Sequence, residues 1–219
     1  TADEIKTKIT EAGIVGMGGA TFPLGVKLSP PPGIVIDTLL INGAECEPYL
    51  TADHALMLEK AEEICIGVEL LKKVLNVSTA KIGIENNKPD AIENMTKTAA
   101  KFSGIEVVPL KVKYPQGSEK HLIQALTGRE VPSGQLPSSI GCVVSNIATT
   151  FAVYEAVEKN KPLFERVVTV TGTALQNPSN LLVRMGTSTA DVLAAVGGMP
   201  ENTAKVISGG PMMGKAIQH

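Results

Sequence analysis

A glycine-rich stretch between residues 13 and 23 is the segment whose composition most directly suggests ligand chemistry. It places Gly13, Gly16, Gly18 and Gly19 within seven residues. Glycine lets the backbone take a positive φ and approach a ligand closely, so that consecutive N–H groups can hold a phosphate or border a flat ring. The spacing is not the Gly-x-Gly-x-x-Gly dinucleotide fingerprint, because Thr21 stands where the last glycine would be, and no Gly-Lys-Ser/Thr follows as in a P-loop. We therefore expect either a ligand-binding loop of another kind or a plain structural turn.

Two residues after this loop extend the ligand hypothesis. Phe22 is one of four phenylalanines in the chain and stands at the exit of the loop, where it can stack on a planar ring. Lys27 lies eight residues after Gly19 and can meet a phosphate as a point charge. The alternatives are that Phe22 anchors the core and that Lys27 is a solvated surface charge.

An acidic loop, residues 42–48, directly follows a run that predicts a buried strand. Asn42 offers both a donor and an acceptor, which suits the carbonyls and ring nitrogens of a flat heterocycle. Glu45 and Glu47 favour a metal, another cation or ribose hydroxyls over a phosphate. Because ligands of open α/β sheets bind beyond the carboxyl ends of the strands, this loop is a candidate site. A turn with two solvated acids is the alternative.

Two later junctions between a turn or strand and a helix have a similar character. Tyr114, Gly117 and Glu119 lead into a predicted helix, whose first N–H groups attract an anion. Asn146 and Thr149 stand at a strand-to-helix junction and can donate to a phosphate. Ordinary helix starts explain both patterns as well, with Glu119 favoured by the helix dipole and Asn146 as an N-cap.

The cysteines and histidines predict neither a metal centre nor a nucleophile. Cys46, Cys65 and Cys142 are odd in number and have no Cys-x-x-Cys spacing, which also fits a reducing compartment. His54 and His121 are not at metal-ligand spacing, and we interpret them as structural. Cys65 lies beside an apolar helix stripe and is expected to be a core thiol. Cys46 stands between two glutamates, so we expect a raised pKa and no nucleophilic role.

The composition restricts the class of protein. Apolar residues make up 43% of the 219 residues and aromatic residues only 3%, which predicts an aliphatic core. The formal net charge of -2 argues against nucleic acid as a main partner. No apolar run reaches the ~18–20 residues of a membrane span, and the first residues do not form a signal peptide. The chain begins without Met, and we expect it to be a piece of a longer protein.

Apolar patterns predict the elements that position these segments. The order of strand, helix, strand, helix and strand is typical of an α/β fold with a mainly parallel sheet, flanking helices and right-handed crossovers. Asn87 and Pro89 are expected to begin a helix as its N-cap and first-turn residue. The other predicted helices cover residues 3–12, 53–76, 118–127 and 147–159, a loop covers 131–141, and the predicted strands cover residues 34–41, 81–85 and 105–112.

The character of the sequence changes after Pro162, and we place a domain boundary near residue 164. Residues 1–163 form the predicted α/β domain, and residues 164–219 form a small β-rich module. Ser188 begins a capping box that predicts a helix ending at two glycines, 197 and 198. Short strands are expected at residues 167–172, 181–184 and 206–208.

Four segments in this order resemble the C subunits of Rnf complexes, the membrane-linked ferredoxin:NAD oxidoreductases of bacteria. They are also similar, more distantly, to the flavin-binding subunit of respiratory complex I. The segments are GMGGATFPLGVK at 16–27, NGAECEP at 42–48, YPQGSEKHL at 114–122 and SNIATT at 145–150. Residues 165–215 resemble the small β-grasp-like soluble ligand-binding (SLBB) module that follows the flavin domain in this family. The resemblance thus covers nearly the whole chain.

This resemblance implies that the four segments bind FMN, with NAD(H) as the substrate, and it identifies no catalytic acid or base. By this resemblance, Phe22, Glu47 and Glu119 face the nicotinamide nucleotide. The residues implied to hold FMN are Gly16, Gly18, Gly19, Lys27, Asn42, Glu45, Tyr114, Gly117, Asn146 and Thr149.

The chain departs from the complex I pattern at several positions. Ala44 and Ser118 stand where that pattern has acids, and the stretch after Gly128 lacks the Lys and Phe of the complex I nucleotide wall. The resemblance therefore supports FMN binding more fully than NADH binding.

The resemblance also implies a role and a location. It points to a peripheral subunit on the cytoplasmic face of the membrane, which works with other subunits to exchange electrons between NAD(H) and iron–sulfur clusters. The [4Fe–4S] clusters are expected in a segment beyond the end of this chain. Two alternatives stay open: a docking module without flavin, as in a related subunit of a sodium-pumping quinone reductase, and the flavin domain of a cobalamin reductase from bacterial microcompartments.

Overall fold

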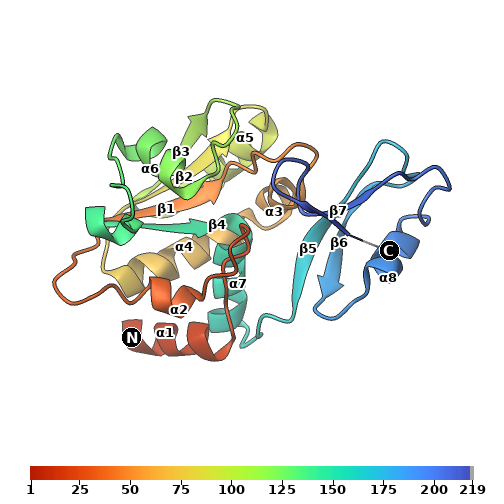
Figure 1. Ribbon diagram of the computed structural model, residues 1–219. Helices are drawn as coiled ribbons and strands as arrows, with labels where there is room; N and C mark the ends of the chain where they lie inside the picture. Colours follow the sequence, from red (N-terminus) through yellow and green to blue (C-terminus); the bar gives the residue numbers. More distant parts are fainter. Residues whose placement is uncertain (218–219) are drawn as a thin grey trace.

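A four-stranded parallel sheet is the centre of the computed structural model, which describes residues 1–217 (Figure 1). The strands lie in the order β3-β2-β1-β4, and each neighbouring pair is parallel. The predicted α/β fold with a mainly parallel sheet is therefore confirmed. The strand bounds are β1 (Thr38–Gly43), β2 (Ala80–Glu85), β3 (Ile105–Leu110) and β4 (Cys142–Asn146).

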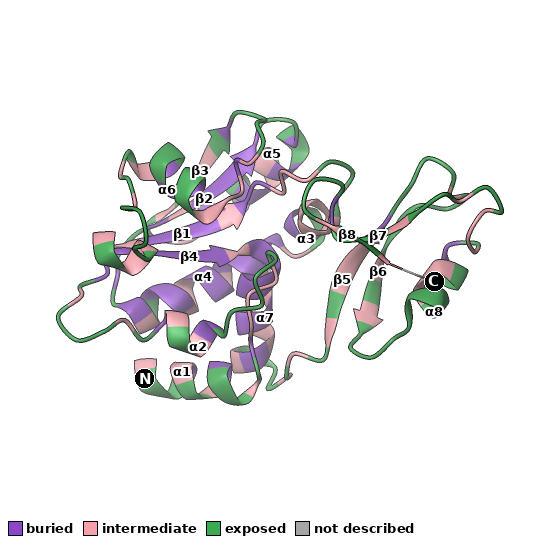
Figure 2. Cartoon of the chain, viewed as in Figure 1, coloured by how far each residue is buried: buried purple, intermediate pink, exposed green. Residues whose placement is uncertain are grey.

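Helices cover both faces of this sheet, because its strands present apolar side chains to both. On β1, Leu39 and Ile41 join the larger core, and Leu40 joins a smaller core on the opposite face. Figure 2 shows the buried residues concentrated in the sheet and in the helix faces turned toward it. The larger core is covered by α1 (Ala2–Glu11), α4 (Ala61–Leu75), α5 (Pro89–Ala99) and α7 (Ile147–Glu158), and the smaller one by α6 (Glu119–Thr127) and the 3-10 helix η1 (Pro137–Ile140).

The strand order reverses beside β1, and this reversal determines where a ligand can bind. The chain crosses from β1 to β2 and β3 through α4 and α5 on one face, and it returns to β4 through α6 on the other. Right-handed crossovers produce this arrangement. As a result, β1 and β4 end side by side at the same edge. In open α/β sheets, ligand sites lie outside the carboxyl ends of the strands at such a reversal.

The prediction of one helix over residues 53–76 is wrong, because two helices occupy this segment. The first is α3 (Ala52–Glu59) and the second is α4. Lys60 separates them with a φ of -129°, which lies outside the helical range. The apolar pattern hides this break, because Met57 before it and Ala61 after it are both buried at helical spacing.

The strand predicted over residues 34–41 begins only at Thr38. The N–H of Ile34 donates to the carbonyl of Pro31 at 3.2 Å, so the proline-rich turn extends into the aliphatic run. Pairing with β4 then fixes the start of the strand. Similarly, β3 ends at Leu110 rather than at residue 112. Composition predicts that these strands exist, but only their pairing decides their ends.

The remaining predictions before residue 164 are mostly confirmed. The helices expected at residues 3–12, 118–127 and 147–159 are α1, α6 and α7, and β2 matches the strand expected at 81–85. Asn87 is not the N-cap of α5; that position is Lys88, and Pro89 follows at the first turn as predicted. The sequence did not predict the short α2 (Leu24–Lys27), or η1 inside the expected loop at 131–141.

Two antiparallel strand pairs and one helix make up the described part of the chain after residue 163. Ser188 caps α8 through a hydrogen bond to the N–H of Asp191 at 3.1 Å, as the capping box predicts. The last strand was not predicted, and the boundary near residue 164 stays a prediction. Of residues 164–217, only Val170, Val196 and Gly210 are buried, so this part has a thin core. The elements are β5 (Glu165–Val170), β6 (Ser179–Arg184), α8 (Thr189–Ala195), β7 (Val206–Ser208) and β8 (Lys215–Ile217).

We expect Gly67→Ala to destabilise the fold, because α4 and α7 cross closely at this glycine. A Cβ atom at Gly67 would overlap the backbone carbonyl of Thr150. Helices that must move apart lose packing, which typically costs about 1–3 kcal/mol, and urea unfolding measures the loss. The control is Gly25→Ala in α2, where the Cβ meets the side chain of Thr10, which can rotate away. Equal stability of the two variants would contradict this interpretation.

Candidate functional site

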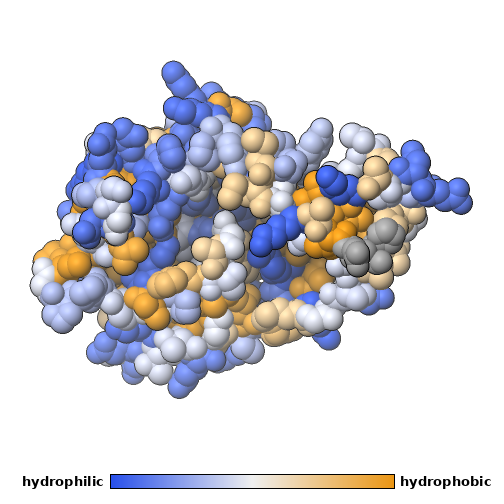
Figure 3. All heavy atoms as spheres, viewed as in Figure 1, coloured by the Kyte–Doolittle hydropathy of each residue, from blue (hydrophilic) through white to orange (hydrophobic). Residues whose placement is uncertain are grey.

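The predicted site segments meet at the carboxyl ends of β1 and β4. Asn42 and Asn146 are direct register partners on these two strands. The side-chain amide of Asn42 donates to the carbonyl of Gly117 at 2.8 Å. A Cβ atom on Gly18 would lie 3.4 Å from the Cβ of Asn146, so the glycine loop touches the same place. Figure 3 shows a recess in the surface near this edge, between the α/β part and the C-terminal part.

The glycine loop is held closed at its base and leaves its tip exposed. The N–H of Gly16 donates to the carbonyl of Phe22 at 2.8 Å, and the N–H of Met17 donates to Oγ1 of Thr149 at 2.8 Å. Gly18 and Gly19 are exposed, and Gly19 has a φ of +133° that favours glycine. The loop therefore has a fixed shape, supported by the first turn of α7, with bare backbone at its tip.

Lys27 and Glu119 form an ion pair beside the end of β4. The Nζ atom of Lys27 lies 2.6 Å from Oε1 of Glu119 and donates to the carbonyl of Val144 at 2.9 Å. The interpretation of Lys27 as a solvated surface charge is therefore wrong. Phe22 is 47% exposed, so it is not a core anchor. Tyr114 is 38% exposed, which leaves a second aromatic ring accessible in the same group of loops.

Glu45 in the acidic loop and Asp53 in the first turn of α3 form a pair of half-buried carboxyl groups. Glu45 accepts the N–H groups of Asp53 and His54 at 2.8 and 3.1 Å, and thereby caps the start of α3. Asp53 accepts the amide of Asn146 at 2.6 Å. Burial, followed by the charge of Asp53, raises the pKa of Glu45 to about 7, and burial raises the pKa of Asp53 to about 6. Glu45 is thus not the solvated acid of the alternative hypothesis.

Glu47 connects the acidic loop to the C-terminal part of the chain. Its two carboxylate oxygens accept the N–H groups of Met212 and Met213, each at 2.9 Å. Gly210 approaches so closely that a Cβ atom there would overlap this carboxylate. Glu47 is therefore half-buried and hydrogen-bonded rather than freely solvated. The turn of residues 209–214 rests on it.

Further polar contacts fix the C-terminal part beside the site. The amide of Asn180 donates to the carbonyl of Thr51 at 3.2 Å, and the N–H of Thr51 donates to Oγ1 of Thr169 at 3.0 Å. Arg166 donates to the carbonyl of Met17 in the glycine loop at 3.1 Å. The sequence did not single out Arg166 or Asp53. Asp53 could have been found as an acid in the first turn of the helix that follows the acidic loop, whereas nothing in the sequence marks Arg166.

The thiols and histidines behave mostly as predicted. Cys65 is fully buried in the core, and burial raises its pKa to about 12. The pKa of Cys46 is raised as expected, although burial contributes more than the neighbouring glutamates do. His54 contacts Asp90 at 2.9 Å, which supports a structural role, and His121 is exposed.

The chemistry of this edge fits FMN. The bare glycine backbone and the amide of Asn146 suit a phosphate or ribityl chain, and the amide of Asn42 suits the polar rim of a flavin ring. Thr149 is buried and supports the loop by accepting the N–H of Met17. At Gly117 the loop after β3 packs closely on the acidic loop, because a Cβ atom there would lie 3.2 Å from Sγ of Cys46.

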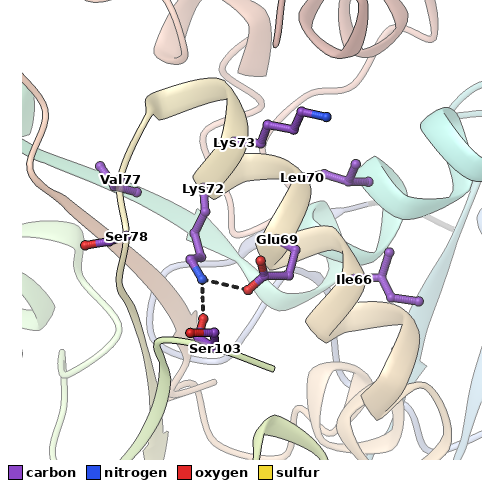
Figure 4. A pocket seen from close by; sticks show the side chains of 8 residues that line it. All are labelled: Ile66, Glu69, Leu70, Lys72, Lys73, Val77, Ser78 and Ser103. Atoms are coloured by element: carbon purple, nitrogen blue, oxygen red, sulfur yellow. Dashed lines mark hydrogen bonds and ion pairs between the residues drawn. The ribbon is translucent and has the colours of Figure 1, made fainter. Parts of the chain in front are cut away.

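A hollow of about 370 Å³ lies elsewhere, at the amino-terminal end of the sheet (Figure 4). It is lined mainly by the second half of α4 and by residues that precede β2 and β3. The Nζ atom of Lys72 contacts Glu69 at 2.7 Å and the carbonyl of Ser103, so this charge is already paired. The hollow contributes no residue to the site at the carboxyl ends.

The fold and the site define an open parallel α/β domain with a glycine loop and two asparagines at the carboxyl ends of its central strands. A family model described as the Nuo51 FMN-binding domain matches residues 9–155, and the chain belongs to this family. A model for the SLBB domain matches residues 167–216. The resemblance inferred from the four sequence segments is thereby confirmed.

Relatives with known names support the same assignment. The chain is 55% identical over 95% of its length to the C subunit of the proton-translocating ferredoxin:NAD(+) oxidoreductase complex of Clostridium ljungdahlii. It is 50% identical over 97% of its length to the Na(+)-translocating counterpart of Acetobacterium woodii, and 47% over 99% to the C subunit of the ion-translocating oxidoreductase complex of Rhodobacter capsulatus. The chain spans 45%, 48% and 42% of these relatives, which is about half their length or less.

Solved structures show the same fold at low sequence identity. Crystal structures of an NAD+-reducing [NiFe]-hydrogenase, air-oxidized and H2-reduced, match 90% of this chain and 39% of theirs, with TM-scores of 0.75 and 0.73 at 23% identity. No helix within residues 1–217 has the length and apolar character needed to cross a bilayer.

We expect Glu45→Gln to flatten the pH dependence of stability. Folding raises the pKa of Glu45 from 4.5 to about 7. Between these values the folded chain binds more protons than the unfolded chain, so its free energy of unfolding falls as pH rises through this window. Glutamine removes this proton uptake and keeps an oxygen that accepts the N–H groups of α3.

Urea unfolding near pH 5 and near pH 8 measures this effect as a smaller difference between the two free energies. The control is Glu59→Gln, because Glu59 is an exposed carboxyl at the end of α3, the helix that Glu45 caps. This variant should leave the difference as it is. An unchanged difference in Glu45→Gln would contradict the assignment.

We expect Gly210→Ala to release the turn of residues 209–214 from Glu47. Because the added methyl group would overlap the carboxylate, hydrogen exchange at the amides of Met212 and Met213 should rise about tenfold or more. Gly172→Ala is the matched control in the same part of the chain, since its Cβ would meet only Leu175 at 3.8 Å. Equal exchange rates in the two variants would show that the turn does not depend on this contact.

Proposed function

We propose that this chain binds FMN at the carboxyl ends of β1 and β4. We further propose that it serves in an electron-transport subunit that exchanges electrons between NAD(H) and iron–sulfur clusters of an ion-translocating Rnf-type complex. When bound, FMN exchanges a hydride with a nicotinamide and single electrons with iron–sulfur clusters. The chain itself has to bind the flavin and the nicotinamide, orient them and shield them from water. No side-chain acid or base is assigned to the chemistry.

One observation carries this proposal: four segments far apart in the sequence converge on the register pair Asn42 and Asn146. The glycine loop touches Asn146 at Gly18, Thr149 holds the loop, and Gly117 is bonded to Asn42. Membership of the FMN-binding family supports the same ligand.

The proposed roles follow from chemistry and position. The tip of the glycine loop and Asn146 hold the ribityl phosphate, Thr149 holds the loop in place, and Asn42 and Glu45 border the ring. Lys27 supplies positive charge at the site, balanced by Glu119. Gly16, Gly19, Gly117 and Tyr114 complete the proposed FMN site.

Phe22, Glu47 and Glu119 are proposed to meet the nicotinamide nucleotide. Phe22 is exposed and accessible to it. Glu47 and Glu119 already have partners within the chain, so the nucleotide has to share or displace these contacts. NAD(H) binding therefore depends on a rearrangement of these two contacts.

The partners and the location are part of the proposal. The named relatives are subunits of ion-translocating complexes. We propose that this chain lies on the cytoplasmic face of the membrane as a peripheral subunit, beside other subunits of such a complex. The [4Fe–4S] clusters are placed outside residues 1–219.

A docking module without flavin is the second candidate function. It is favoured by the contact between Glu47 and the turn of residues 209–214, which covers a residue of the proposed nucleotide site. In this alternative, the C-terminal part is a fixed support for a partner.

Reconstitution with FMN tests the proposal. The chain is incubated with FMN, desalted and examined by absorption spectroscopy, and NADH is then added without oxygen. We expect retained flavin bands that NADH bleaches. Gly18→Val places a side chain between the loop and Asn146, so it should weaken FMN binding about tenfold or more. Gly172→Val, which has space around it, should not.

The outcomes separate the candidates. If flavin is retained but NADH does not bleach it, the result would support the flavin site and contradict NADH oxidation by this chain. No retained flavin in the unaltered chain would favour the docking module.

A further inference from the structure

A buried ion pair lies next to the proposed flavin site and has no role in the proposal above. Glu85, the last residue of β2, is 2% exposed, and Lys88, at the N-cap position of α5, is 6% exposed. The Nζ atom of Lys88 lies 3.8 Å from Oε2 of Glu85. Burying two charges costs free energy unless hydrogen bonds satisfy both groups. Both side chains therefore need hydrogen-bond partners within the protein.

Each member of the pair holds a different loop of the site. Lys88 donates to the carbonyl of Ala44, in the acidic loop of residues 42–48, at 3.1 Å. Glu85 accepts the N–H of Lys113, in the loop of residues 111–118, at 3.2 Å. The first loop follows β1 and the second follows β3, while the pair itself stands between them at the end of β2.

Asn42 joins the same two loops at a second place. Its amide donates to the carbonyl of Gly117 at 2.8 Å, and its oxygen accepts the N–H of Ala44 at 3.2 Å. The contacts thus close a circuit that runs from Glu85 to Lys88, Ala44, Asn42, Gly117 and back through Lys113. Two loops tied at two places have a defined separation, whereas one tie would leave them free to pivot.

We propose that Glu85 and Lys88 are positioning residues, which set the separation of the two loops that border the flavin ring. The effect of this pair on flavin binding rests on the proposed function. The linkage of the two loops does not, because it is made by contacts within the chain.

Lys88 also acts on the carboxyl pair of the site. Its positive charge lowers the pKa of both Glu45 and Asp53, against the larger effect of burial. Arg166 on β5 also lowers the pKa of Asp53, whereas His54 on α3 meets Glu45 through its backbone N–H and turns its ring to Asp90. A role that was only structural would not change the pH dependence of the carboxyl pair.

The test uses Lys88→Met with Lys72→Met as the matched control. Lys72 is also 6% exposed and bonded to a glutamate and a backbone carbonyl, but it lies at the opposite end of the sheet (Figure 4). Hydrogen exchange is measured on the chain without flavin, followed by FMN titration. The double variant Glu85→Gln with Lys88→Met removes both buried charges and replaces the single variant if the latter does not fold.

In Lys88→Met, or in the double variant, we expect exchange in residues 42–48 and 111–118 to rise about tenfold or more, with a similar loss of FMN affinity. The pH range over which the free energy of unfolding falls should move to higher pH, because the charge of Lys88 no longer lowers the pKa of the two carboxyl groups. In Lys72→Met the two loops, the FMN affinity and the pH window should stay as in the unaltered chain. Equal changes in the Lys72 and Lys88 variants would overturn the inference. If the unaltered chain binds no FMN, the proposed function fails, and the exchange data still decide the positioning role.

Discussion

The parallel pairing of β1 with β4 is the constraint on which the rest of this structure depends. It is produced by a crossover that returns the chain to the far side of β1, and it places Asn42 beside Asn146 at one edge. Every other segment of the site is located by contact with these two residues or with their strands. The glycine loop meets Asn146, the loop after β3 meets Asn42, and Lys27 reaches the carbonyl of Val144 in β4. A shift of β4 by one residue would turn Asn146 to the other face of the sheet, away from Asn42.

The polar groups of the site already have partners within the protein. Glu45 holds the start of α3, Lys27 is paired with Glu119, and Glu47 holds the turn of residues 209–214. Such contacts pre-organise a site, because the side chains lose little further freedom when a ligand binds. A nucleotide that binds to Glu47 or Glu119 has to compete with the internal contacts of these residues.

The C-terminal part contributes to the site through position rather than through its own core. Few of its described residues are buried, and it is tied to the α/β part by side chains of Glu47, Asn180 and Arg166. All three contacts end on loops next to the site. A small module with a thin core gains stability from such docking.

Local pattern in the sequence determined the fold class, most helices, the existence of the central strands and the four segments of the site. Periodic apolar residues and glycine or proline punctuation specify these features without reference to the rest of the chain. The break at Lys60, the start of β1 at Thr38 and the partners of Glu45, Glu47 and Lys27 were decided only by tertiary structure. Glu85, Lys88 and Arg166 had no signal in the sequence for the same reason. A charged residue in a sequence is read as solvated by default, and only the packing of distant strands and loops shows that it is buried or bonded.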